Sequence, residues 1–160
     1  MSVSIQAPVV TASNRLAQSR AATSAGTPSL TARQKHVIRE SLLRLEPALD
    51  LVGTLFLRKL FQLDPSLRAR FDGPAETQGR KFMAGLKLTI ISLNHEDGLA
   101  PTLKLLGVRH RQLGIKLRHY RIMARALMWT LEQSLGKGFT RETKNAWTAL
   151  LSQLTRILTA

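Results

Sequence analysis

The chain has 160 residues, enough for one ordinary domain with a single hydrophobic core. It contains no cysteine, which excludes disulfides, thiolate nucleophiles, and zinc or iron–sulfur centres held by cysteine. The 24 lysines and arginines outnumber the 10 aspartates and glutamates, and the net charge of +14 favours anionic partners in general: nucleic acid, anionic lipid, or ligands bearing carboxylate or phosphate.

Residues 1–28 are predicted to form a disordered tail. The segment is rich in Ser, Ala and Thr, lacks periodic apolar positions and ends in Gly-Thr-Pro. It contains Arg15 and Arg20, and no acidic residue precedes Glu40, so an organellar transit peptide is an alternative to a cytoplasmic location. The apolar runs of the chain are far shorter than the roughly 20 residues that span a bilayer, and a membrane protein is therefore not predicted.

Residues 29–160 are predicted to form one all-α domain, because apolar residues recur at helical spacing and no stretch alternates as a strand would. The first helix opens with hydroxyl residues suited to capping and places its apolar side chains on one stripe. The members of that stripe are Val37, Ile38, Leu42 and Leu45. A second helix follows from Pro47, with Leu51, Leu55 and Phe61 among its inward candidates.

Proline and glycine divide the rest of the domain. The second helix is expected to end at Asp64, because Pro65 pushes the residue before it out of the helical region. The remaining helical segments are expected over residues 65–71, 75–96, 99–112, 115–135 and 140–160. The third of these ends near Gly114, and Thr140 is the expected N-cap of the last.

His110 is the histidine whose position on its helix predicts burial, since it lies seven residues after Leu103 and four after Leu106. The spacing alone leaves two interpretations open, a buried neutral histidine bonded to a nearby carbonyl and a metal ligand. The other histidines are His36, His95 and His119. The first two lie among polar residues and are expected in solvent, whereas the third could face either way. No histidine pair has the spacing of a helix-borne zinc site, and no hydrolase triad stands out.

Four stretches of the sequence resemble the globin family, specifically microbial single-domain globins, the globin part of flavohaemoglobins and, more distantly, neuroglobin. They are LFLRKLFQLDPSLRARF, QGRKFM, LGVRHRQLGIKLRHY and LEQSLGKGFTRETKNAW. The resemblance covers roughly residues 30–158 and implies a globin fold, a helical sandwich around a haem pocket, with haem b as cofactor. The seven-residue step from Phe71 to Gln78 leaves no room for the extra short helix of vertebrate globins. Trp147 in the last helix is implied to be structural.

The resemblance also implies a set of site residues. His110 resembles the proximal iron ligand, Gln78 falls at the distal position, and Phe71 resembles the phenylalanine that wedges against the haem. The implied cations at the haem rim are Lys81, Arg109 and, beside them, Arg80. The other implied haem contacts are Leu57, Phe82, Leu106, Leu113, Ile115, Tyr120 and Met123.

Two expectations concern hydrogen bonds at this site. The second ring nitrogen of a ligating histidine is normally held by an acceptor, and the backbone carbonyl of Leu106 is the expected partner of His110. Flavohaemoglobins carry a tyrosine near the bound ligand at the position of Leu57, so Gln78 is the evident distal donor. Because glutamine is a poor iron ligand, the resemblance implies a haem with one histidine rather than two. The carboxylate that acts with the proximal tyrosine in flavohaemoglobins has no counterpart here.

The implied function is reversible binding of O2, NO or CO. NO dioxygenation would need a separate reductase, because the sequence contains no reductase domain, and peroxidase-like work is left open. The alternatives are a globin-fold sensor or interaction module and a basic helical nucleic-acid-binding protein, which the scarcity of aromatic side chains argues against. A monomer or weak dimer is expected. Two haem propionates offset only a small part of the charge of +14, so the excess has no explanation at this level.

Overall fold

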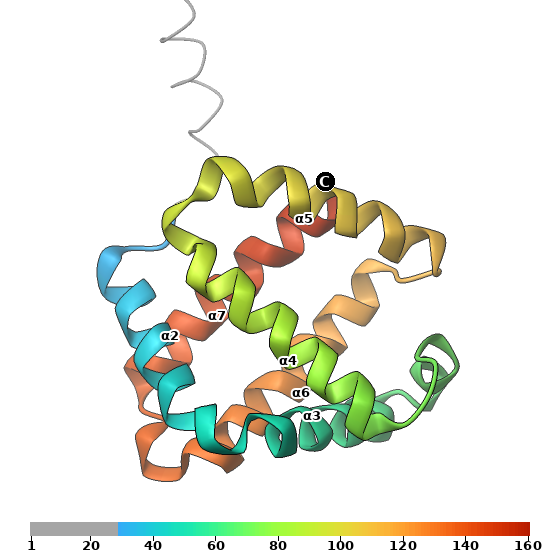
Figure 1. Ribbon diagram of the computed structural model, residues 1–160, viewed down its shortest axis with the longest axis horizontal. Helices are drawn as coiled ribbons and strands as arrows, with labels where there is room; N and C mark the ends of the chain where they lie inside the picture. The colour runs from blue at the N-terminus through green and yellow to red at the C-terminus, as the bar shows by residue number, and fades with distance from the viewer. Residues whose placement is uncertain (1–28) are drawn as a thin grey trace, which may run out of the picture.

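The computed structural model describes residues 29–160, and the predicted tail and its transit-peptide alternative lie outside this part. All regular structure within these residues is helical, as predicted (Figure 1). The α-helices are α2 (Ala32–Leu45), α3 (Leu49–Leu63), α4 (Ala75–Ile91), α5 (Glu96–Gln112), α6 (Leu117–Leu135) and α7 (Arg141–Thr159). Short 3-10 helices are η1 (Glu46–Ala48), η2 (Pro65–Arg70), η3 (Ser92–Asn94) and η4 (Gly136–Gly138). Within 29–160 no helix has the length and hydropathy needed to cross a membrane.

The predicted boundaries differ from the observed ones mainly around residues 91–99. The expected helix over 75–96 is divided into α4 and η3, because its last residues tighten into a 3-10 turn, as helix ends often do. The next helix begins at Glu96 and continues through Pro101, although proline has no backbone N–H for the helical ladder. The axis of the site-bearing helix is therefore longer than the sequence suggested.

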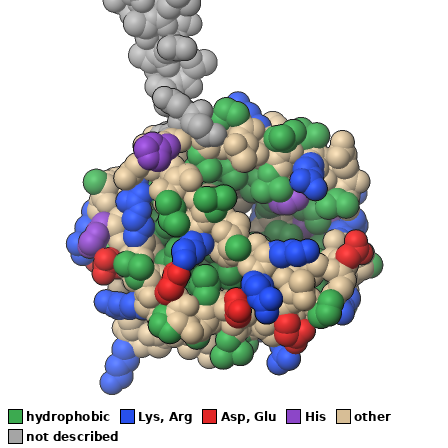
Figure 2. All heavy atoms as spheres, viewed as in Figure 1, with side chains coloured by type: hydrophobic (Ala, Val, Ile, Leu, Met, Phe, Trp, Pro, Cys, Tyr) green, Lys and Arg blue, Asp and Glu red, His purple; other side chains and the backbone are tan. Residues whose placement is uncertain are grey.

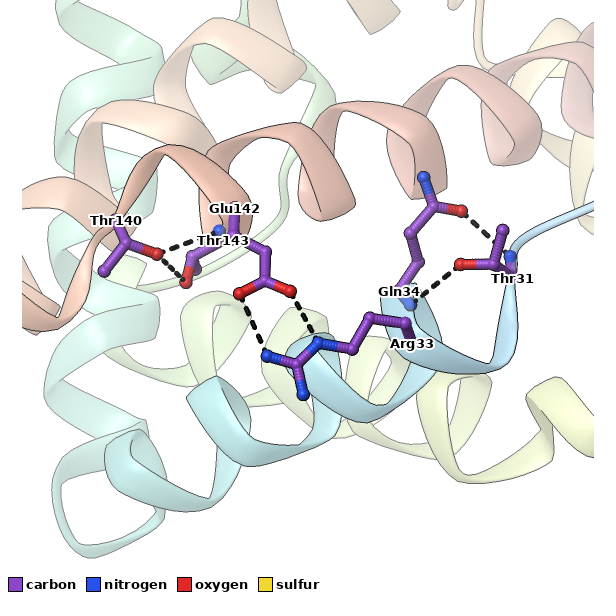
Figure 3. Close-up of polar contacts among 6 residues, drawn as sticks. All are labelled: Thr31, Arg33, Gln34, Thr140, Glu142 and Thr143. Carbon is purple, nitrogen blue, oxygen red and sulfur yellow. Dashed lines mark hydrogen bonds and ion pairs between the residues drawn. The ribbon is translucent and has the colours of Figure 1, made fainter.

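Threonine caps fix where α2 and α7 begin. The Thr31 hydroxyl accepts from the backbone N–H of Gln34 at 3.0 Å, and the Gln34 side chain accepts in return from the Thr31 N–H at 2.9 Å (Figure 3). At the start of α7 the Thr140 hydroxyl accepts from the N–H of Thr143 at 3.2 Å, which confirms Thr140 as the N-cap. Each cap satisfies backbone donors that the first turn of a helix leaves without a partner.

The start of α7 lies beside α2. Arg33 in α2 contacts both carboxylate oxygens of Glu142 in α7, at 2.6 and 3.0 Å (Figure 3). Deeper between these helices Trp147 is fully buried, and its indole N–H donates to the Ser41 hydroxyl at 2.8 Å. That hydroxyl donates to the carbonyl of Ile38 at 2.8 Å, so the polar groups beside the tryptophan are satisfied.

The apolar stripe predicted for the first helix is confirmed, because all four of its members are buried. The prediction for the second helix was wrong at Leu51, which is 71% exposed, while Leu55 and Phe61 are partly buried. The buried side chains of α3 are instead Val52, Thr54, Phe56, Leu57 and Leu60. The run LVGTLFL is apolar around most of its circumference, so its periodicity does not decide which side faces the core.

The crossing of α3 and α4 decides that question. A Cβ atom added at Gly53 would lie 2.4 Å from the backbone oxygen of Gly79, and one at Gly79 would lie 2.5 Å from the carbonyl carbon of Gly53. The two backbones therefore touch, and only glycine fits on either side. This contact turns the Gly53 side of α3 toward α4 and leaves Leu51 outside.

The crossing predicts opposite effects for two glycines in the same helix. Gly79→Ala places a methyl group against the α3 backbone and should lower the free energy of unfolding by about 1–3 kcal/mol. Gly85→Ala meets nothing within 4 Å and should raise it by about 0.5–1 kcal/mol, because alanine is the better helix former. Urea denaturation of both variants measures this. Equal stability of the two would contradict the observed contact.

Candidate functional site

A tight turn between α5 and α6 brings His110 beside Tyr120. The turn starts where the N–H of Ile115 donates to the carbonyl of His110 at 2.9 Å. It passes through Gly114 at φ +75°, a conformation that favours glycine over residues with a Cβ atom. The chain then enters α6, and the Tyr120 hydroxyl lies 2.8 Å from the Nδ1 atom of His110. Two helices thus meet in one hydrogen bond between side chains.

This contact corrects the expected partner of His110. The Leu106 carbonyl was predicted to accept the ring hydrogen bond, but the partner is the Tyr120 hydroxyl. The physical reason lies in the helix, because the carbonyl of residue 106 faces the backbone N–H four residues later, which is that of His110 itself. The hydroxyl from the next helix reaches the ring without competing with the ladder.

Both groups of the pair are held in their neutral forms. Burial lowers the pKa of His110 below its ordinary value, and the nearby charge of Arg109 lowers it further. Burial raises the pKa of the Tyr120 hydroxyl, with a smaller opposing effect from Arg111. When Nδ1–H donates to the tyrosine oxygen, Nε2 carries the lone pair. A neutral imidazole in this tautomer is a competent metal ligand.

The face of α5 that carries His110 is apolar and reached by solvent. Leu106, His110 and Leu113 share this face, being four and seven residues apart. His110 is half-buried, while Leu106 is 39% and Leu113 58% exposed, so the expectation that Leu106 is buried was wrong. The face is therefore open to solvent and is not part of the packed core. Figure 2 shows a hollow on the side where α4 crosses, with hydrophobic and histidine side chains in its wall.

Aromatic side chains from α3, α4 and the end of η2 pack near the α3–α4 crossing. Phe82 in α4 stacks on Phe56 of α3, with ring centroids 4.2 Å apart, and Leu57 beside it is fully buried. Phe71, directly after η2, meets Phe61 edge to face at 5.5 Å. Phe71 and Phe82 are themselves partly buried, so each keeps apolar surface in reach of a ligand.

Gln78 lies one turn before Phe82 on α4, and its side chain already has a partner. The side-chain amide of Gln78 donates to the backbone carbonyl of Asp72, in the connection that leads into α4. This bond uses one of two amide N–H groups and leaves the second for another acceptor. The bond therefore fixes the position of the Gln78 amide. Its second N–H is still available for the distal role that the resemblance to globins implies.

The expected rim cations divide into two groups. Lys81 and Arg109 are exposed. This exposure is consistent with contact to the propionates at the edge of a haem. Arg80 is also exposed and lies 3.3 Å from the carboxylate of Asp50 in α3, so its guanidinium already has an anionic partner on the protein. Among the remaining expected contacts, Ile115 is buried and Met123 is half-buried. Lys and Arg side chains are visible around the hollow in Figure 2.

His119 is a residue whose position the sequence did not settle. It is fully buried, and its Nδ1 accepts from the backbone N–H of Lys116 at 2.8 Å, which caps the start of α6. Its Nε2 is buried with no hydrogen-bond partner. Burial lowers the pKa of His119, and the charges of Arg118 and Arg70 add to this effect. The available signal was its position, three residues after the helix start, where a side chain can cap.

A model of the globin family matches residues 54–158, more than half of the chain, and the chain therefore belongs to the globin family. It is 26% identical over 123 residues to a flavohemoprotein of Vibrio cholerae, covering 75% of this chain and 31% of that protein. It is 24% identical over 144 residues to neuroglobin of Danio rerio, covering 81% of this chain and 91% of that one. The chain thus spans about a third of the length of the flavohemoprotein.

A solved structure agrees with this assignment. A hexacoordinated heme protein from an anhydrobiotic tardigrade superimposes with a TM-score of 0.68 at 22% identity, covering 81% of this chain and 93% of that one. The similarity confirms the predicted globin fold. A flavohemoprotein of Bordetella parapertussis, 26% identical over 106 residues, matches 64% of this chain and 26% of its own length.

The residues of the hollow fit a haem. A haem needs an apolar slot, one axial nitrogen, and cations for its propionates. His110 supplies a neutral nitrogen held in one orientation by Tyr120. Leu106 and Leu113 present apolar surface on either side of that nitrogen. Among the described side chains no three His, Cys, Asp or Glu residues gather as a metal site.

The hydrogen bond between His110 and Tyr120 predicts a loss of haem affinity in Tyr120→Phe. The variant keeps the ring volume but leaves Nδ1 without its partner, so the imidazole is free to rotate. Haem affinity should fall about 10-fold or more, as when other partners of metal ligands are removed. Competition with apomyoglobin for haemin measures the change, and an unaltered affinity would show that the hydroxyl does not orient the ring.

His119 predicts a pH-dependent contribution to stability. The unfolded chain protonates this histidine near pH 6.5, whereas burial keeps it neutral to lower pH in the folded protein. The unfolded state then binds more protons, so the free energy of unfolding falls as the pH drops below about 6.5. His119→Asn keeps an acceptor for the Lys116 N–H and lacks this titration. The stability difference between wild type and variant should narrow from about pH 7.5 to 5, and a constant difference would contradict the account.

Proposed function

We propose that this globin binds haem b through Nε2 of His110 and uses it to bind a diatomic gas reversibly. The observation that carries the proposal is the neutral, oriented imidazole between two exposed leucines in the wall of a hollow. When bound, the haem iron supplies an open coordination position for O2, NO or CO. What the protein adds is the orientation of the ligand, the exclusion of water and the choice of hydrogen-bond donors.

Each wall of the hollow has a distinct task in this proposal. Tyr120 holds the imidazole, and Leu106 and Leu113 cover the face of the haem around it. Phe71 and Phe82 cover the opposite face, where apolar surface excludes water and protects ferrous iron from oxidation. The propionates are bound by Lys81 and Arg109, and the remaining contacts are those of Leu57, Ile115 and Met123.

The side opposite His110 determines how tightly a gas is held. Leu57 is fully buried and apolar, so it contributes no donor. The second amide N–H of Gln78 is then the available donor, and O2 should be held about 1 kcal/mol less tightly than with two donors. Neither α3 nor α4 contains a histidine. We therefore propose a single histidine ligand, unlike the coordination named for the tardigrade protein.

NO dioxygenation is the catalytic role that fits the similarity to flavohemoproteins. The match covers 31% of the Vibrio cholerae protein, and within this proposal a flavin reductase delivers the electrons that NO dioxygenation needs. The proximal Tyr120 is in place, but no carboxylate hydrogen bond to it is present among the described residues. Slow turnover relative to gas binding is therefore expected.

The proposal predicts that haem retention depends on His110 and not on the exposed histidines. After reconstitution with haemin and gel filtration, the wild-type protein should show a Soret band in the ferric, dithionite-reduced and CO-bound forms. His110→Gly should lose most of its haem and regain the spectrum with added imidazole, which replaces the missing ring. His36→Gly and His95→Gly, both exposed, are the matched controls and should retain haem. An unchanged Soret band in His110→Gly would refute the axial assignment.

A further inference from the structure

Positive charge is concentrated in one segment that includes the proposed haem ligand. Between Gly98 and Leu131 the sequence contains seven lysines and arginines and no aspartate or glutamate. These residues are Lys104, Arg109, Arg111, Lys116, Arg118, Arg121 and Arg125. The two propionates of a haem can pair with only a few of these cations. Haem binding therefore leaves most of this positive charge without a role.

Part of this charge forms a compact surface at the turn between α5 and α6, which we call the corner patch. It consists of Arg70, Lys116, Leu117, Arg118 and Arg121, all of them exposed. Arg70 is fixed there from η2, because its guanidinium donates to the carbonyl of Leu113. Arg70, Lys116 and Arg118 all lie near enough to the buried His119 for their charges to lower its pKa. Arg118 and Arg121 are three residues apart and share the outer face of α6.

Among the side chains that the structure describes, no carboxylate forms an ion pair with a cation of the corner patch, although the charge of Asp64 reaches Arg118. The ion pairs that involve Asp50, Glu46, Glu76 and Glu142 lie on α2, η1, α3, α4 and α7. Within residues 29–160 none of Lys116, Arg118 and Arg121 lies at ion-pair distance from an acidic side chain. Asp64 is the carboxylate whose charge reaches His119 and Arg118, and it accepts from the N–H and hydroxyl of Ser66.

The centre of the patch is apolar. Leu117 is 47% exposed, and Lys116 and Arg118 stand directly before and after it in the chain. An exposed leucine with cations on both sides is typical of a protein–protein interface, which has an apolar centre and a polar rim. A nucleic-acid site would use aromatic platforms for bases, and Tyr120, the aromatic side chain closest in sequence, is buried.

We propose that the corner patch docks a small acidic flavoprotein that delivers electrons to the haem. The inference rests on the proposed haem function and names the surface its reductase uses. The turn that precedes the patch is bonded to His110 at both ends, through the Ile115 N–H and the Tyr120 hydroxyl, so a donor bound at the patch lies near the axial ligand. One electron leaves the reduced flavin of the donor, which is oxidised by one electron, and ferric iron becomes ferrous. No bond to the protein forms or breaks.

The test uses two matched double charge reversals. Arg118→Glu/Arg121→Glu changes the patch, and Arg141→Glu/Lys144→Glu makes the same change in net charge in the first turns of α7, on the other side of the molecule (Figure 1). Binding of purified flavodoxin to the haem-reconstituted protein is titrated from about 20 to 300 mM NaCl. Reduction of the ferric protein by reduced flavodoxin under CO is followed by stopped flow.

The patch reversal should weaken flavodoxin binding at low salt by about tenfold or more, slow reduction in parallel and flatten the salt dependence. The α7 reversal should leave both within about twofold. Equal losses in the two variants, or no loss in either, would refute the docking surface. Tighter binding of duplex DNA or of anionic vesicles than of flavodoxin, abolished by the patch reversal, would assign the surface to that partner instead. If the protein fails to retain haem while flavodoxin binding still depends on the patch, the docking surface stands and the proposed function falls.

Discussion

The structure of the site depends on the hydrogen bond between His110 and Tyr120. It joins α5 to α6 across a turn that only a glycine with positive φ allows, and it fixes the plane of the imidazole. Burial favours the neutral form of both partners, so the bond persists without a charge on either. The leucines on the apolar face of α5 are exposed beside this oriented imidazole nitrogen. An exposed apolar surface next to a potential metal ligand indicates a binding site.

The α3–α4 wall, which we place opposite His110, depends on a different constraint. This constraint is the backbone contact between Gly53 and Gly79. Because α3 and α4 touch there, Phe56 and Phe82 stack, and Leu57 is buried against them. The wall to which we assign gas binding is thus built on a rigid crossing, whereas the wall that carries the proposed haem ligand is built on a turn. Changes of ligand affinity are therefore more accessible to substitution at Gln78 and Leu57 than to movement of the helices that carry them.

The sequence predicted the all-α class, the stripe of α2 and the cap at Thr140, because these follow from local spacing and side-chain chemistry. It misplaced Leu51, since an apolar run without polar interruptions does not show which face a glycine crossing selects. It also misassigned the partner of His110 and did not predict the ion pair of Arg80 with Asp50, because both contacts join residues from different helices. The candidate ligand itself emerged from spacing only after the whole pattern resembled a globin, since a single histidine on an apolar stripe has more than one explanation.

The excess positive charge and the haem site are brought together by one corner of the fold, where α5 ends and α6 begins. The central claim is that His110 is the one protein ligand of a haem whose other side is open. The most direct measurement is the absorption spectrum of the reconstituted, dithionite-reduced protein before and after addition of CO. A broad high-spin spectrum that sharpens and shifts with CO is predicted. A low-spin spectrum with split visible bands before any ligand is added would contradict the claim, as would a failure to retain haem.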